Sequence, residues 1–144
     1  MNKSTLVSMS DFSKNKIKDY KYWTIFIHDN QSYLGRCIIW CKRNKAVDLA
    51  DANLDELKEL TIILKRLKQI IHKAFGANWF NYSFLGNATK HLHMHFVPRY
   101  ESSRQFENVI FKDNRHGHNY LTDHSFKISE ELLQKVKNKI IENL

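Results

Sequence analysis

The segment "HLHMHFVP", residues 91–98, carries the strongest pattern in the chain. Histidine occupies positions 91, 93 and 95, while Leu92, Met94 and Phe96 fill the positions between and after them. Successive side chains of a β-strand point to opposite faces, so this alternation predicts a strand with imidazoles on one face and apolar side chains on the other. The apolar face belongs in a core, and the histidine face must meet something polar.

Three further segments predict strands that join this one in a sheet. Residues 20–29 ("YKYWTIFIHD") and 35–43 ("GRCIIWCKR") are rich in β-branched and aromatic residues and predict an antiparallel pair. Residues 79–87 ("WFNYSFLGN") predict another strand, and Pro98 would end the histidine strand.

Two segments have helical spacing. Asn53 can cap a long helix with Glu56 three residues on, and Gly76 stands where a left-handed C-terminal cap would fall. Ser129 begins a second helix with an apolar stripe that reaches Leu144. Strands and helices are segregated along the chain. This favours an α+β fold with an antiparallel sheet of about five strands, a long helix and a C-terminal helix.

The length of 144 residues fits one domain over 1–144, with a core at 20–100, a loop-rich segment at 101–128 and a C-terminal helix at 129–144. No apolar run approaches the roughly 20 residues that a membrane span needs. The polar start lacks a signal-peptide core, so we expect a cytoplasmic protein with a frayed amino-terminal end. Two cysteines, Cys37 and Cys41, predict free thiols on one face rather than a disulfide.

The net charge of +8 raises the question of a polyanionic partner. The excess is scattered over the amino-terminal lysines, residues 42–45 and the outer faces of both helices, and it forms no compact basic stripe. Solvated basic faces are common, so we do not expect nucleic acid as a partner. A phosphate-bearing substrate suits the charge equally well.

Three interpretations of the histidines compete. They could be half-exposed side chains on a solvated sheet, although strict alternation argues against that. They could bind a metal, but His91 and His95 would start about 13 Å apart on a strand, which strains a shared ion. A third ligand would then have to come from elsewhere, for example from His28, His116, His118 or Asp123.

The third interpretation is nucleophilic catalysis at phosphorus. A neutral imidazole is a competent nucleophile at neutral pH, because its ordinary pKa is about 6.5. It must present one nitrogen with a free lone pair, so its other nitrogen must donate to a fixed acceptor. Flanking histidines can then contact phosphate oxygens or assist the leaving group.

The segment "HLHMHFV" resembles the histidine-triad pattern, His-φ-His-φ-His-φ-φ with φ apolar, of the HIT superfamily of nucleotide hydrolases and transferases. The following Pro98-Arg99 and the preceding "GNATKH" are also similar to that family. The likeness covers roughly residues 20–100 and is nearest to a bacterial branch. It implies the HIT-like α+β fold, a nucleotide substrate and a homodimer.

The resemblance implies catalytic roles for all three histidines. His93 would attack the α-phosphorus and form a nucleotidyl-histidine intermediate, with its other nitrogen held by the backbone carbonyl near His91. His95, with His91 as a further candidate, would contact the phosphate and help the leaving group depart. Candidate substrates are a dinucleoside polyphosphate, a nucleoside phosphoramidate or an adenylylated metabolite. The family needs no metal for this step, although Mg²⁺ can accompany a polyphosphate.

The resemblance also implies binding residues. Asn81 would steady the phosphate or leaving group, and Gly86 and Asn87 lie in the turn that would bind phosphate. Asp29, or His28 beside it, stands near the ribose position. Arg99 is either a phosphate contact or a surface charge.

The chain departs from the family pattern in places. Arg36 stands where members often have histidine, and it either holds the phosphate or makes a salt bridge at the sheet edge. Asn44 replaces a later histidine, Asn87 the usual glutamine, and Ala88 the hydroxyl residue three positions before His91. Arg36 and Ala88 would suit an alternative function, a nucleotide sensor with little turnover.

Overall fold

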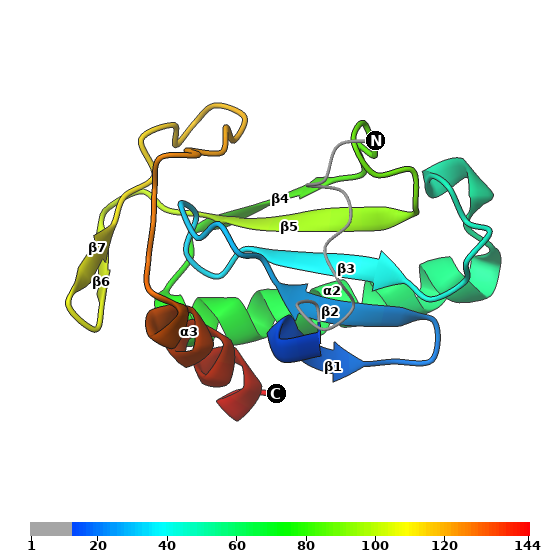
Figure 1. The fold of residues 1–144 in the computed structure, drawn as a ribbon, viewed down its shortest axis with the longest axis horizontal. Coiled ribbons are helices and arrows are strands. Elements are labelled where there is room, and N and C mark those ends of the chain that lie inside the picture. The colour runs from blue at the N-terminus through cyan, green and yellow to red at the C-terminus, as the bar shows by residue number, and fades with distance from the viewer. Residues whose placement is uncertain (1–12) are drawn as a thin grey trace.

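The computed structural model describes residues 13–144 and shows an α+β fold built on one main sheet (Figure 1). Its five strands are all antiparallel to their neighbours and lie in the order β1-β2-β3-β5-β4. They are β1 (Lys16–Asp19), β2 (Trp23–Ile27), β3 (Cys37–Cys41), β4 (Trp79–Ser83) and β5 (His93–Arg99). The predicted fold class is therefore confirmed.

The helix α2 (Leu54–Phe75) covers one face of the sheet. The predicted capping box is present, because Asn53 accepts from the Glu56 N–H and Glu56 accepts from the Asn53 N–H. Gly76 ends the helix in the left-handed conformation, with φ of 72°. The apolar face of β5, including Met94 and Phe96, is fully buried beneath this helix.

Gly35 sets the distance between the helix and the start of β3. Its φ is 86°, and a Cβ atom there would meet Ile71 and Phe75 side-chain carbons at 3.3 Å. A larger residue would meet both the left-handed backbone and the crowding from α2. Gly35 therefore fixes the position of the next residue, Arg36, which points to the other face of the sheet.

Both cysteines are free and buried on the helix side of β3, as the sequence predicts. Burial raises the pKa of the Cys41 thiol to about 11 and raises that of Cys37 further. Neither thiol ionises appreciably at neutral pH, so both act as small neutral core groups, with Cys37 donating to the Gly35 carbonyl and Cys41 to the Glu56 carboxylate.

Two parts of the chain differ from expectation. β1 falls in the stretch expected to be frayed, and it pairs with β2 through an irregular register. The loop-rich segment contains a two-stranded hairpin of β6 (Arg104–Phe106) and β7 (Val109–Phe111). Strands of three or four residues are too short to show alternation, so periodicity does not reveal them.

The remaining elements close the core. A short 3₁₀ helix, η2 (Leu49–Asp51), precedes α2. The predicted last helix, α3 (Glu130–Glu142), is capped by Ser129 and packs near α2 and β1. Within residues 13–144, none of the helices has the length and apolar character to cross a membrane.

Candidate active site

The histidines of β5 lie on the face of the sheet opposite α2. On that face Trp40 of β3 stands across from His93, and Ser83 of β4 stands across from His95. His93 is buried, with 8% of its surface exposed, whereas His91 and His95 are partly buried. The alternation in the sequence thus places core side chains on one side and the imidazole row on the other.

His93 has one nitrogen held by the backbone. Its Nδ1 lies 2.6 Å from the carbonyl oxygen of His91. A carbonyl only accepts, so Nδ1 carries the ring hydrogen and donates it. In the neutral ring the lone pair is then on Nε2. This is the hydrogen bond expected of a nucleophilic imidazole.

His91 is held in a similar way by a different strand. Its Nε2 lies 2.5 Å from the Cys41 carbonyl oxygen at the end of β3. Its ring stacks on the Trp40 indole, with centroids 4.1 Å apart and planes 14° apart. The same indole stacks on His93 at 5.5 Å. Trp40 therefore fixes the orientation of two of the three imidazoles.

Arg36 contacts the third imidazole. Its Nη2 lies 3.1 Å from His95 Nδ1, and its Nη1 donates to the Thr122 hydroxyl at 2.7 Å. The guanidinium also lies over the Tyr120 ring, 5.3 Å from its centroid. Only 4% of Arg36 is exposed, and no carboxylate among residues 13–144 forms an ion pair with it. The alternative of a salt bridge at the sheet edge is therefore wrong.

The site disfavours protonated histidine next to Arg36. Burial, Arg36 and His93 lower the pKa of His95 to about 4. Burial, Arg36 and His95 lower the pKa of His28, whose ring lies 5.8 Å from that of His95, to about 3. Both rings are therefore neutral at pH 7, and Arg36 supplies the positive charge of this part of the site.

Arg99 lies in the interior, with 3% of its surface exposed, so it is not a surface charge. Its Nε and Nη2 donate to the Asp113 carboxylate at 2.7 and 3.1 Å. Nη1 donates to Asn81 Oδ1 and to the His118 carbonyl, and Nη2 also donates to the Arg115 carbonyl. These five bonds use all five guanidinium donors. Arg99 therefore anchors residues 113–118 to the sheet and has no donor left for a phosphate.

The other candidate binding residues do not gather around one cavity. Asn81 accepts from Arg99, so its amide nitrogen remains available to donate. Gly86, with φ of 60°, and the exposed Asn87 lie in the turn between β4 and β5. Asp29 is exposed and accepts from Asn15 at 2.7 Å. Of these four residues, only Asn81 lines a cavity described below.

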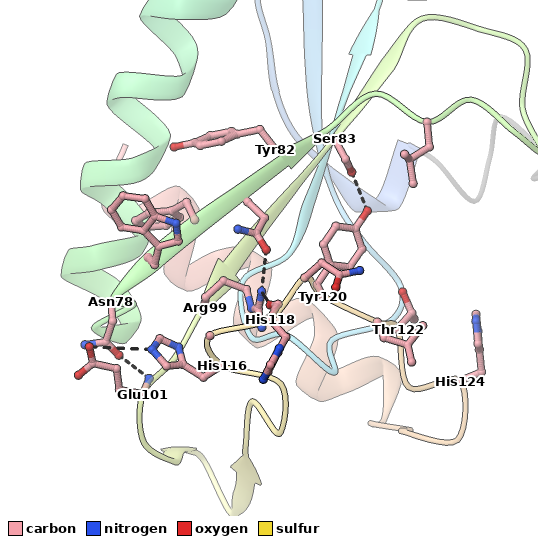
Figure 2. Close-up of a pocket in the computed structure, with 17 residues that line it drawn as sticks. Asn78, Tyr82, Ser83, Arg99, Glu101, His116, His118, Tyr120, Thr122 and His124 are labelled. Atoms are coloured by element: carbon pink, nitrogen blue, oxygen red, sulfur yellow. Dashed lines mark hydrogen bonds and ion pairs between the residues drawn. The ribbon is translucent and has the colours of Figure 1, made fainter.

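Two cavities lie at opposite ends of the histidine row. The smaller, about 420 Å³, is lined by residues that include His91, Trp40, Asn44, Lys16 and Lys42. The larger, about 1000 Å³, lies between β4 and the segment 116–124 (Figure 2).

Residues from both elements line the larger cavity. Figure 2 shows Ser83 and Tyr120 facing each other, and their hydroxyls are 2.6 Å apart. His116 and His118, named above as candidate metal ligands, are exposed on its wall. Because Ser83 is the cross-strand neighbour of His95, the row runs from one cavity toward the other.

Sequence reasoning missed three residues of the site. Trp40 could have been predicted. Ile38 and Trp40 of β3 share one face with Arg36, which stands just before the strand, because the three residues are spaced by two. Tyr120 and Thr122 had none, because they lie in an irregular segment far along the chain from Arg36. No group of three or more His, Cys, Asp or Glu side chains in the described part of the chain is arranged to hold a metal ion.

Comparisons with known proteins agree with this fold. A model of the HIT domain matches residues 10–102. A histidine triad (HIT) protein from Sinorhizobium meliloti superposes with a TM-score of 0.73 at 19% identity, covering 94% of each chain. A histidine triad protein from Marinobacter aquaeolei has a TM-score of 0.71 at 14% identity, covering 94% of this chain and 93% of that one.

A more distant structure is that of the diadenosine triphosphate hydrolase from Plasmodium falciparum. Its TM-score is 0.62 at 15% identity, and the match covers 90% of this chain and 75% of that chain. At such identities the likeness to solved structures shows the fold alone. No curated protein matches the sequence.

Proposed function

Because the chain belongs to the HIT domain family, we propose that it is a nucleotide hydrolase or nucleotidyl transferase that acts through His93. The observation that carries the proposal is the 2.6 Å hydrogen bond from His93 Nδ1 to the His91 carbonyl. That bond leaves the Nε2 lone pair for attack. The substrate is a nucleotide joined through its α-phosphate to a leaving group.

The proposed reaction has two steps. In the first, His93 Nε2 attacks the α-phosphorus, the bond from phosphorus to the leaving group breaks, and a nucleotidyl-histidine forms. In the second, water attacks the same phosphorus and the phosphorus–nitrogen bond breaks. A nucleoside monophosphate is released and the neutral ring is restored. His91, His95 and the Asn81 amide are the proposed contacts of the phosphate oxygens.

Electrostatics support a phosphate at this position. Arg36 is a buried cation without a carboxylate partner among the described residues. A buried charge is costly unless it is paired, so an arriving anion relieves that cost. The proposed chemistry needs no bound metal. Mg²⁺ would enter, where it does, as part of a polyphosphate substrate.

The test is a mass spectrum of the intact protein after brief incubation with a diadenosine polyphosphate or adenosine phosphoramidate, quenched without acid. We expect a nucleotidyl mass gain with monophosphate accumulating. His93→Asn should abolish both and leave nucleotide affinity nearly unchanged, because only the nucleophile is lost. His116→Asn, an exposed histidine of the larger cavity, is the matched control and should keep the adduct.

Two results would contradict the proposal. If His93→Asn still forms the adduct, another residue is the nucleophile. If the wild-type protein binds nucleotide yet gives neither adduct nor product with either substrate, hydrolysis of these substrates is excluded and a sensor function is favoured.

We further propose that the protein is a homodimer joined through β4. This strand is an edge of the sheet, and Trp79, Tyr82 and Leu85 at and just beyond it are 63%, 43% and 59% exposed. No strand within residues 13–144 pairs with the outer edge of β4, and such an edge next to exposed apolar side chains suits pairing with a second copy about a two-fold axis.

A further inference from the structure

Arg36 and His95 form a contact whose chemistry allows only one arrangement of hydrogens. The guanidinium carries donors and no acceptor, and it stays charged in proteins. Its Nη2 lies 3.1 Å from His95 Nδ1, so that nitrogen must accept. In neutral His95 the ring hydrogen is then on Nε2. His93 has the reverse arrangement, since its Nδ1 donates to a carbonyl.

Arg36 is itself held firmly. Its Nη1 donates to the Thr122 hydroxyl at 2.7 Å, the Tyr120 ring lies against the guanidinium, and Gly35 fixes the backbone just before it. The Tyr120 hydroxyl is in turn 2.6 Å from that of Ser83, the cross-strand neighbour of His95. The arginine therefore cannot easily turn away from His95.

We propose that Arg36 is a positioning residue that fixes His95 as a neutral hydrogen-bond donor through Nε2, and that this makes the site selective for leaving groups that depart without a proton. The selectivity for leaving groups rests on the function proposed above, whereas the tautomer of His95 does not. In this state His95 stabilises charge on a phosphate oxygen by hydrogen bonding. If it gave up its only hydrogen it would become an imidazolate, which is too basic to form at neutral pH.

The substrate class follows from this restriction. The leaving group of a phosphoanhydride, such as a nucleoside polyphosphate, departs as a stable anion when its bond to the α-phosphorus breaks. The amine of a phosphoramidate must gain a proton as its phosphorus–nitrogen bond breaks, and His95 is not a source of it. Phosphoanhydrides are therefore the preferred class.

The groups around His95 agree with a neutral ring. His93 faces it from the same strand at 5.3 Å between centroids, and His28 faces it at 5.8 Å. Ser83 and Ile38 flank it on the neighbouring strands. Burial, with smaller contributions from Arg36 and His93, lowers the pKa of His95 to about 4. None of these neighbours is a carboxylate that would stabilise an imidazolium.

The first test is the nitrogen NMR spectrum of the histidine rings in the wild-type protein at pH 7, which requires no turnover. We expect His95 protonated at Nε2 only and His93 at Nδ1 only. In Arg36→Met the Nδ1–H form of His95 should appear, and the ring should titrate at higher pH. Arg36→Lys can still donate and should keep the wild-type tautomer. Arg66→Met, on the exposed face of α2, is the control.

The second test compares rates on a diadenosine polyphosphate and on adenosine phosphoramidate. The ratio of the first rate to the second should fall about a hundredfold in Arg36→Met, the lower end of what a general acid contributes, because a His95 that titrates at higher pH can take up a second proton and pass it to the amine from Nε2. Arg36→Lys should keep the wild-type ratio.

The outcomes separate the two claims. A wild-type His95 that carries its hydrogen on Nδ1 overturns the positioning role, whether or not the variants fold. An unchanged substrate ratio in folded Arg36→Met overturns the selectivity. Absence of turnover on both substrates counts against the proposed function, and the NMR result still decides the role of Arg36.

Discussion

At the level of single residues, the partner of each imidazole decides which nitrogen can react. His93 donates to a carbonyl, so its Nε2 offers a lone pair. His95 accepts from a guanidinium, so its Nε2 offers a hydrogen, although the two side chains are identical and only two residues apart. The strand predicted from the alternation supplied the common face. The partner of His95 was not predictable, because Arg36 lies 59 residues away and its contact depends on the folded sheet.

Arg99 shows the same limit and leads to a prediction. Arg99→Lys keeps the charge but cannot reproduce the two-pronged contact with Asp113. We expect a loss of about 3 kcal/mol in the free energy of unfolding, typical of breaking a buried pair. Urea unfolding measures it. Within residues 13–144 the side chain of Arg115 donates only to Asn119, so Arg115→Lys is the control and should cost far less.

The opposite pattern would restore Arg99 as a binding residue. If Arg99→Lys unfolds like the wild-type protein yet binds nucleotide much more weakly, Arg99 reaches the phosphate in the bound state and the anchoring role is wrong.

At the level of elements, periodicity and capping were reliable where segments were long. The helix from Asn53 to Gly76 was predicted at both ends, because its capping box and its terminal glycine are local signals. β1 and the β6–β7 hairpin were not, since three or four residues are too few to show a clear period. The segment 112–124, which supplies Tyr120 and Thr122, is irregular. Arg99 holds it against the sheet through hydrogen bonds to its carbonyls, so its own sequence does not predict its position.

The free edge of β4 leads to a second prediction at this level. Trp79→Glu places a charge on that edge, so a dimer joined there should dissociate, and light scattering should report half the molar mass at micromolar concentration. Ile110→Glu is the control, because Ile110 is equally exposed, at 64% against 63%, but lies in the β6–β7 hairpin. A variant Trp79→Glu that keeps the mass of a wild-type dimer would place the interface elsewhere.

For the whole molecule, the neutral histidines of the site make stability depend on pH. In the folded chain the pKa values of His28 and His95 are about 3 and about 4, against 6.5 for an ordinary histidine. Below pH 6.5 the unfolded chain therefore binds more protons than the folded one, and the free energy of unfolding falls. The slope from these two groups fades above pH 7 and is negligible by about pH 8.

The expected loss between pH 6.5 and pH 5 is at most about 2 kcal/mol for each ring. The Arg43 hydrogen bond lowers the pKa of Glu56 from 4.5 to about 2. Glu56 therefore changes the free energy of unfolding mainly below pH 5, outside the range in which the two histidines act. Urea unfolding at pH 7 and pH 5 measures the slope, and His95→Asn should remove about half of it. A wild-type stability that is flat over this range would show that the rings are accessible to protons in the folded state.

Trp40 also makes the site observable by fluorescence. Its indole lies against His91 and His93, whereas Trp23 is fully buried and Trp79 is largely in solvent. A nucleotidyl group on His93 turns that ring into a cation beside the indole, a charge to which its fluorescence responds. A dissolved quencher suppresses Trp79 first, so the remaining emission comes from Trp40 and the buried Trp23, of which only Trp40 lies beside the histidines. The chain thus carries its own unlabelled probe for following the intermediate in real time.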